Sequence, residues 1–326
     1  MSDNGSSAAP SSPARAGPAL RWTASPEARR DRAEPQPGAG SLEIVIVSYR
    51  CRDLLFACLQ SIAMNPYTAG ATAITVVDNA SADGTVAAVR AAFPAVRVVG
   101  LSANVGFAAA NNLALRESRA EHILLLNPDT EVWPEVLDAM ARFLGEHPAA
   151  GVAGCRLVRR DGSFDHAAKR SIPTIANALR HFQPGGSPST YLAPHVAEHE
   201  VGPVDAVNGA FMLIRRQAME EAGLLDEGYW MYGEDLDWCT RFRRAGWDVL
   251  YNGRVTTLHV KGATAGSHRR LRQNVAFHHA MGRFYRRHLG GDHVLLDGIV
   301  YTAIVAKLGF SVCRSLLART ADRRWR

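Results

Sequence analysis

The first continuous apolar run of the chain, LEIVIVSYR at 42–50, follows about forty residues without apolar periodicity. A short β-branched run of this kind is typical of a strand buried on both faces of a parallel sheet. The segment after it places Leu54, Leu55, Cys58 and Ile62 on one side of a helix. The chain therefore predicts a strand followed by an amphipathic helix.

This alternation continues along the chain. It predicts further strands at 73–77, 96–99, 122–126, 210–214 and 248–251 and helices at 85–92, 108–116 and 134–144. Strands and helices joined by short loops predict an α/β fold with an open, mostly parallel sheet flanked by helices. Ligands bind such sheets beyond the carboxyl ends of the strands. The loop-rich stretch 164–201 is interpreted as a lid or an insertion that faces a ligand.

Composition divides the chain into three parts. Residues 1–40 are rich in Ser, Ala, Pro, Gly and Arg, which predicts a disordered tail. We expect one folded domain at 41–290, with a nucleotide-binding half at 41–150 and a second half at 151–290. Residues 291–326 are expected to form a basic, amphipathic helical segment.

The C-terminal segment leaves two alternatives open. Val294–Leu317 is apolar, but Asp297, Lys307 and Arg314 interrupt it, and the uninterrupted stretch Gly298–Ala306 is shorter than the ~20 residues of a spanning helix. One interpretation is an in-plane helix with a cationic end on a membrane surface. The other is a helix packed on the domain or on a second copy in a homodimer.

Cysteine usage and charge limit the compartment and the partner. Five cysteines without a CxxC pair argue against a disulfide framework and a zinc site. With no apolar leader before the folded part, this predicts a cytoplasmic protein. The net charge of +6 indicates an anionic partner, and nucleic acid, a membrane surface and phosphate-bearing small molecules all qualify.

Polar residues follow the predicted strands. Asp78 ends one strand, where an acid can accept hydrogen bonds from a base or ribose and turn chemistry does not require one. In the next turn Gly106 permits close approach of a ligand, and the helix after it would present free N–H groups to a diphosphate. Asn127 and Asp129 can hold a hard divalent cation. The alternative there is a helix start capped by Asp129 or Thr130.

Paired acids follow an aromatic stretch. Glu234 and Asp235 are predicted at a helix N-terminus, where the helix dipole favours the ionised carboxylate that a general base needs. Trp230 and Tyr232 are candidates to stack on an acceptor sugar, and plain capping is the alternative role for the acids.

Two further polar features have ordinary structural explanations. Asp237 and Arg241 are expected to form a surface ion pair of modest value. A lone histidine such as His259 is more often structural, and it becomes a candidate ligand only beside a metal at Asp129.

Together these segments resemble the family two glycosyltransferases of the GT-A fold, in particular their rhamnosyltransferase-like bacterial branch. The similarity extends from about Leu42 to Gly266, and the motifs occur in the order VVDNASADGT, NVGFAAANN, LLLNPDT, VNGAFMLIRR, LLDEGYWMYGEDLDWCTRFRRAGW and a single His. The resemblance implies a UDP- or dTDP-sugar donor, Mn²⁺ or Mg²⁺, and transfer with inversion to a glycan or lipid-linked acceptor in cell-surface polysaccharide synthesis.

The resemblance also implies roles for single residues. Asp78 would contact the nucleotide base, and Asn104, Gly106 and Asn127 would lie at the donor. Asp129 would bind the metal with His259 as a further ligand, and Asp235 would be the catalytic base with Glu234 as its rival. Asn127 stands where many relatives have the first Asp of a DxD motif. One fewer negative charge suggests weaker metal binding without donor.

Three other function classes fit less well. A nucleotidyltransferase should carry a Gly-rich basic loop after its first strand, and Ser48–Cys51 is not one. A non-catalytic sugar-nucleotide binder would be expected to lose the acid pair. A nucleic-acid-binding protein would explain the charge, but no recognised motif accompanies the arginines, and we expect no nucleic-acid partner.

Overall fold

The computed structural model describes residues 40–172, 191–260, 271–291 and 293–323. The predicted N-terminal tail and part of the loop-rich stretch 164–201 lie outside these residues. Side chains are described up to Cys313.

The first strands form the parallel part of a nine-stranded sheet. β1 (Leu42–Ser48) lies between β2 (Thr72–Asp78) and β4 (His122–Leu126), and β3 (Arg97–Gly100) pairs with β2, all in parallel. β1 and β4 are fully buried, as their apolar runs predict. The expected α/β sheet is therefore confirmed in this half.

The second half of the sheet is mixed. β10 (Phe211–Arg215) runs antiparallel to both β4 and β6 (Ala150–Val158), and β6 is parallel to β11 (Asp248–His259). β5 (Thr130–Glu131) and β8 (Val201–Pro203) both pair antiparallel with β11. The full order is β3-β2-β1-β4-β10-β6-β11-β5. β11 thus continues beyond the predicted 248–251 to His259.

The sequence does not predict β6. Its glycines weaken the strand pattern, but they make room for neighbours. A Cβ at Gly151 would lie 2.8 Å from side-chain atoms of Ala218 and Trp247, and one at Gly154 would lie 2.7 Å from Val207. Close packing of the adjacent elements therefore explains these glycines.

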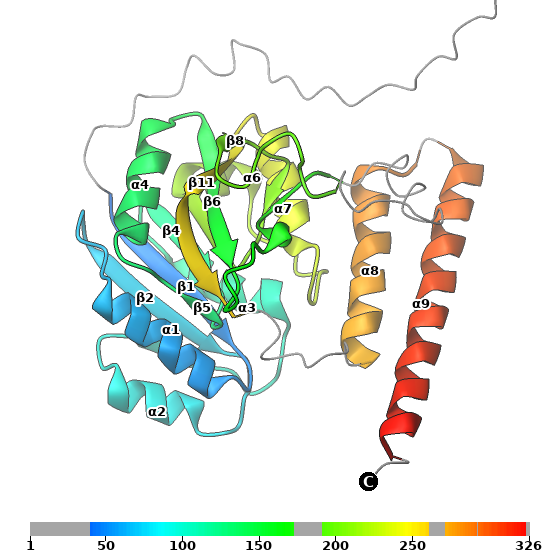
Figure 1. The fold of residues 1–326 in the computed structure, drawn as a ribbon, viewed down its shortest axis with the longest axis horizontal. Coiled ribbons are helices and arrows are strands. Elements are labelled where there is room, and N and C mark those ends of the chain that lie inside the picture. Colours follow the sequence, from blue (N-terminus) through cyan, green and yellow to red (C-terminus); the bar gives the residue numbers. More distant parts are fainter. Residues whose placement is uncertain (1–39, 173–190, 261–270, 292, 324–326) are drawn as a thin grey trace, which may run out of the picture.

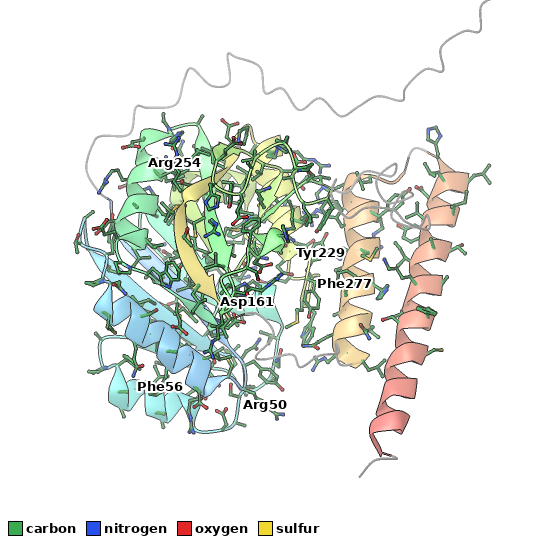
Figure 2. The ribbon with its side chains drawn as sticks, viewed as in Figure 1. Arg50, Phe56, Asp161, Tyr229, Arg254 and Phe277 are labelled. Atoms are coloured by element: carbon green, nitrogen blue, oxygen red, sulfur yellow. The ribbon has the colours of Figure 1, made fainter. Side chains whose placement is uncertain are left out.

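Helices flank the sheet (Figure 1). They are α1 (Arg52–Met64), α2 (Thr85–Ala92), α3 (Phe107–Glu117), α4 (Val136–Glu146), α6 (Arg216–Ala222) and α7 (Glu234–Arg244). Phe56 of α1 packs edge-on against Phe93, with 5.4 Å between ring centres (Figure 2). The short helix η1 (His166–Ala168) leads into β7 (Lys169–Arg170), which pairs with β9 (Ala206–Val207) in a small second sheet.

A helical hairpin lies beside this body (Figure 1). It consists of α8 (Leu271–His288) and α9 (Val294–Arg323), so the expected C-terminal helical segment is a single long helix. The Tyr285 hydroxyl of α8 donates to Asp297 of α9 at 2.7 Å, and the rings of Tyr285 and Tyr301 lie 5.6 Å apart.

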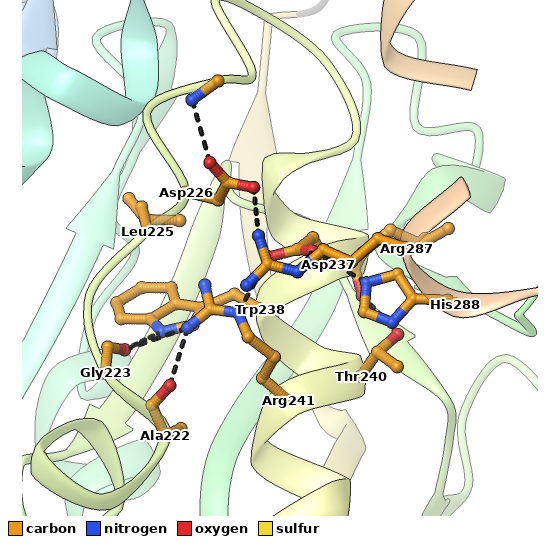
Figure 3. Close-up of polar contacts among 12 residues, drawn as sticks. Ala222, Gly223, Leu225, Asp226, Asp237, Trp238, Thr240, Arg241, Arg287 and His288 are labelled. Carbon is orange, nitrogen blue, oxygen red and sulfur yellow. Dashed lines mark hydrogen bonds and ion pairs between the residues drawn. The ribbon is translucent and has the colours of Figure 1, made fainter. Parts of the chain in front are cut away.

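A buried ionic cluster attaches α8 to α7 (Figure 3). Asp237 is fully buried, and its carboxylate accepts from Arg241 Nε at 2.8 Å and lies 2.7 Å from Nε2 of His288. Beside it Asp226 accepts from Arg283 at 2.8 and 3.0 Å and from Arg287. Burial alone would raise the pKa of Asp237, but His288 and Arg241 lower it overall.

The prediction that Asp237 and Arg241 form a surface pair is therefore wrong about its exposure. The two residues do pair, but α8 covers the carboxylate, and spacing along one helix cannot reveal a helix that folds over it.

We expect Asp237→Ala to lower the free energy of unfolding by about 3–5 kcal/mol, because Arg241 would lose its buried counter-charge and His288 its hydrogen-bond partner. Urea unfolding measures this. The matched control is Glu220→Ala, which breaks the exposed i,i+4 pair with Arg216 and should change stability by at most about 1 kcal/mol. Equal effects of the two substitutions would contradict the structural role of the cluster.

Candidate active site

The candidate acids of the N-terminal half lie at one edge of the sheet. Asp78 is the last residue of β2, and Asp129 lies three residues beyond the end of β4. Because β2 and β4 flank β1 in parallel, their carboxyl ends open on the same side. The structure therefore brings both carboxylates to the edge where ligands bind such sheets.

Asp78 uses only one of its carboxylate oxygens within the chain. It is 3% exposed, and Oδ2 accepts from the N–H of Ser81 at 3.0 Å. Among the described residues, Oδ1 is buried without a hydrogen-bond partner. The expectation that the turn does not use this acid is therefore wrong for Oδ2, while Oδ1 is suited to a ligand donor.

Asn79 joins two loops at this edge of the sheet. Its Nδ2 donates to the carbonyl of Gly106 at 3.0 Å, and its Oδ1 accepts from the N–H of Val105 at 2.9 Å. The N–H of Phe107 donates in turn to the carbonyl of Trp230 at 2.8 Å. The turn after β2, the start of α3 and the aromatic loop are thus held as one unit.

This arrangement corrects the interpretation of Gly106. A Cβ there would lie 2.5 Å from the carbonyl oxygen of Trp230, so the close approach is to the chain's own backbone. The N–H of Gly106 donates to Oδ1 of Asn104 at 3.1 Å. With Val105 and Phe107 also engaged, these three N–H groups are not presented free to a diphosphate. Asn104, expected at the donor, shapes this turn.

Asp129 lies against His259. β5 and β11 pair with Thr130 opposite His259, and the N–H of Val260 donates to the carbonyl of Asp129 at 2.7 Å. His259 Nε2 is 3.4 Å from Asp129 Oδ1, and His259 Nδ1 is 3.0 Å from Oδ2 of Asp165. Burial would lower the pKa of His259, but the two carboxylates raise it to about 9.

The alternative of a capped helix at Asp129 is excluded. Residues 130–131 form β5, and the next helix begins only at Val136. The Thr130 hydroxyl donates to the carbonyl of Ala210 at 3.2 Å. The Asn127 N–H donates to the same carbonyl at 3.1 Å, which fixes the backbone of this turn.

The donor set is suited to a divalent ion that shares its shell with a ligand. No group of three His, Cys, Asp or Glu side chains that could hold a metal occurs in the described part of the chain. Asp129 and, once it has lost the proton on Nε2, His259 could supply two donors. The contact of Asp165 with Nδ1 would then orient His259 in the way that carboxylates support metal-binding histidines. Diphosphate oxygens would supply the remaining ligands.

Asp235 is held in a buried ion pair. α7 begins at Glu234, as predicted, and Asp235 Oδ2 accepts from Arg170 Nη2 at 2.5 Å and from the N–H of Gly209 at 3.3 Å. Burial alone would lower the pKa of Arg170, but the negative charge of Asp235 raises it overall. Oδ1 accepts from the N–H of Leu236 at 2.8 Å. The N-cap of α7 is Gly233 and no side chain caps the helix start, so the alternative of plain capping by the acid pair is wrong.

Glu234 has a different environment. It is 7% exposed, and its Oε2 is buried without a hydrogen-bond partner among the described residues. Burial, together with the charge of Asp235, raises the pKa of Glu234 to about 8. The expectation that the helix N-terminus keeps this acid ionised at neutral pH is therefore wrong for Glu234, because desolvation outweighs the helix dipole.

α8 packs against the aromatic loop. The Arg272 guanidinium lies 4.0 Å from the ring centre of Trp230, and Tyr232 meets Phe277 edge-on at 5.9 Å. Figure 2 shows Tyr229 of the same loop beside α8, near Phe277. Both candidate stacking residues are half-buried, and a cation already covers one ring face of Trp230, so any sugar would use the remaining surface.

Three site residues are missing from the sequence-based set. Asp165 and Arg170 lie in the loop-rich stretch without a motif, and Asn79 lies in the turn after Asp78, where asparagine is a common turn residue. Their positions depend on pairing between distant segments, such as β7 with β9. No local signal in the sequence identifies them.

This chain is similar in sequence to known proteins of one family. A family model described as glycosyltransferase like family 2 matches residues 37–277. N-acetylglucosaminyl-diphospho-decaprenol L-rhamnosyltransferase of Mycobacterium tuberculosis is 28% identical over 254 residues, which is 73% of this chain and 81% of that protein. Rhamnosyltransferase WbbL of Escherichia coli is 27% identical over 153 residues, 45% of this chain and 57% of its own.

Solved structures share the GT-A fold. The mannosyltransferase PcManGT from Pyrobaculum calidifontis in complex with GDP-Man and Mn²⁺ superposes with a TM-score of 0.56 at 18% identity, covering 92% of this chain and 86% of that one. GalNAc-T7 with UDP, GalNAc and Mn²⁺ gives a TM-score of 0.52 at 13% identity, covering 84% and 57%. The expected fold class is confirmed.

We expect Gly106→Ala to destabilise the protein by about 3 kcal/mol or more, because a left-handed backbone and overpacking against Trp230 add together. Gly84→Ala is the matched control, since Gly84 also has a positive φ, of 82°, but no atom within 4 Å of a built Cβ. It should cost about 1–2 kcal/mol. Urea denaturation compares the two, and equal losses would show that Gly106 is not a packing contact.

Proposed function

Because this chain belongs to glycosyltransferase family 2, we propose that its cleft transfers a sugar from a nucleotide-diphosphate donor to an acceptor hydroxyl with inversion at the anomeric carbon. One observation carries the proposal. The N–H of Gly209 contacts Asp235, and the next residue, Ala210, accepts hydrogen bonds from the turn that carries Asp129. The candidate base and the turn of the candidate metal acid are therefore attached to two consecutive residues, Gly209 and Ala210.

The donor is proposed to be a UDP- or dTDP-sugar that contacts Asp78. The buried Oδ1 of Asp78 supports this, because a base or ribose donor would satisfy it. Because two relatives are rhamnosyltransferases, we propose a rhamnose-like sugar or another hexose as the transferred sugar. Because the name of one of them includes a decaprenol-linked substrate, we propose a lipid-linked glycan as the acceptor. We also propose that the protein uses its donor in the cytoplasm and acts in the synthesis of cell-surface polysaccharide.

Asp129 and His259 are proposed to hold Mn²⁺ or Mg²⁺. Such an ion neutralises charge that develops on the leaving diphosphate. Asp165 fixes the ring of His259 by its contact with Nδ1, which leaves Nε2 directed at Asp129. Asn127 would add its side-chain oxygen on the donor side.

Asp235 is proposed as the general base. The acceptor oxygen attacks the anomeric carbon as the bond to the diphosphate oxygen breaks, and the hydroxyl proton passes to Asp235. Arg170 supports this role because its guanidinium fixes the orientation of the carboxylate through a charge-assisted hydrogen bond. Glu234 is less suited to be the base, since a buried acid with a raised pKa is largely protonated at neutral pH.

Asp129→Ala should abolish the Mn²⁺-dependent part of nucleoside diphosphate binding while the fold is retained, because one of two protein ligands is lost. Calorimetry with and without Mn²⁺ measures this. Asp161→Ala is the control, since Asp161 is an exposed acid of the same sheet edge that bonds only to Ser163. Full turnover of the metal-stripped wild type in excess EDTA would contradict metal dependence.

Asp235→Asn should reduce turnover by ~10²–10⁴-fold with nucleotide affinity near wild type, because the amide can still accept from Arg170 but cannot take a proton. Transfer assays and calorimetry separate the two effects.

Glu234→Gln tests the rival assignment. A transfer rate that climbs through about pH 8 and is lost in Glu234→Gln, with Asp235→Asn near normal, would move the base to Glu234. If neither substitution changes the transfer rate, neither acid is the base. Absence of transfer in the wild type would instead favour a non-catalytic nucleotide-sugar binder.

A further inference from the structure

α9 presents an apolar surface that the described residues of the chain do not cover. Within the described residues, its stretch Val294–Cys313 is long and apolar enough to cross a membrane, with 20 residues at a mean hydropathy of 1.6. The largest exposed side chains are Val294, Leu295, Ile299, Val305 and Phe310, at 86%, 87%, 57%, 67% and 71% exposure. The sequence-based view that the apolar stretch is too short is thereby corrected, because the helix continues through its charged residues.

The charges of this stretch lie on the other side of the helix. Asp297 and Lys307 are its only charged residues, and both are half-buried. Asp297 accepts from the Tyr285 hydroxyl of α8, and Ile304, also on the covered side, is 9% exposed. The exposed positions recur at spacings of three and four, and they carry only apolar, small or hydroxyl side chains. The uncharged half of α9 is therefore the half that faces outward.

We propose that this outward half of α9, from Val294 to Cys313, docks in the plane of an anionic lipid bilayer. The sequence after Cys313 carries five arginines at 314, 319, 323, 324 and 326 against a single acid, Asp322. An apolar helix face followed by a cationic segment is the combination that binds anionic membrane surfaces. Charge complementarity thus favours a bilayer over a second copy of this basic chain.

α8 argues against a spanning orientation. It runs beside α9, and its Arg286 and Arg287 are exposed close to the turn between the helices. If α9 spanned the bilayer with α8 attached, α8 and its arginines would have to leave water together with it, which is unfavourable. Docking by one face avoids this.

The docking also positions the proposed site. α8 contacts the aromatic loop through Arg272 on Trp230 and contacts α7 through His288 on Asp237. The acceptor side of the cleft is thus joined to the docked helix by α8, as transfer to a lipid-linked acceptor requires. This last step rests on the proposed function, whereas docking itself does not.

Co-sedimentation of the full chain with phosphatidylglycerol vesicles, and with phosphatidylcholine vesicles for comparison, tests the proposal. Wild type should bind the anionic vesicles. Leu295→Gln/Ile299→Gln/Phe310→Gln should lose at least about tenfold in partitioning, because three exposed apolar side chains would no longer be buried in lipid. Met64→Gln is the control, since Met64 is 80% exposed on α1, and it should bind as wild type does.

Wild type that stays in the supernatant, or a triple variant that binds equally well, would overturn the proposal. So would a wild-type dimer by light scattering that becomes a monomer in the triple variant without any vesicle binding, because a second copy would then cover this face. Donor hydrolysis measured on the same samples should be unchanged by the three substitutions. Its absence in wild type would count against the proposed function and not against docking.

Discussion

A carboxylate taken out of water must be met by a hydrogen-bonded cation, and this requirement organises the cleft and the helices around it. An unpaired buried charge is destabilising by several kcal/mol. Asp235 meets Arg170, and Asp237 meets Arg241 and His288. The partners come from distant parts of the chain, so folding must bring β7 and α8 to α7 before its acids can be buried.

Two buried carboxylate oxygens do not meet this requirement within the described residues. Asp78 Oδ1 and Glu234 Oε2 are buried without a partner in the described residues, although native interiors leave few such atoms. Asp78 is already fixed through its second oxygen, so its free oxygen costs stability without organising the turn. Such a cost is understandable where a ligand supplies the missing donor. Glu234 meets the constraint differently, by a raised pKa that favours its neutral form.

Sequence patterns predicted the features that depend on a single helix or strand. The apolar runs identified β1 and β4, and the acids beside them followed from the position of strand ends. Partners across the fold were not predictable, because Asp165 reaches His259 over 94 positions and Arg170 reaches Asp235 over 65. β6 was not predicted because its glycines weaken the strand pattern, and these glycines instead allow tight packing with later elements.

α8 shows why local reasoning about charge failed at Asp237. An acid and an arginine four positions apart describe an exposed pair only if nothing packs over them, and α8 does so with His288. The same helix holds α9 through Tyr285 and touches Trp230 through Arg272. One element therefore completes the charge balance of α7 and carries the exposed apolar face. Because a buried ion pair tolerates little displacement, the direction of that face is fixed relative to the helix that bears Asp235. Whatever covers α9 must then approach the cleft from one side, which is the property a surface-bound acceptor would need.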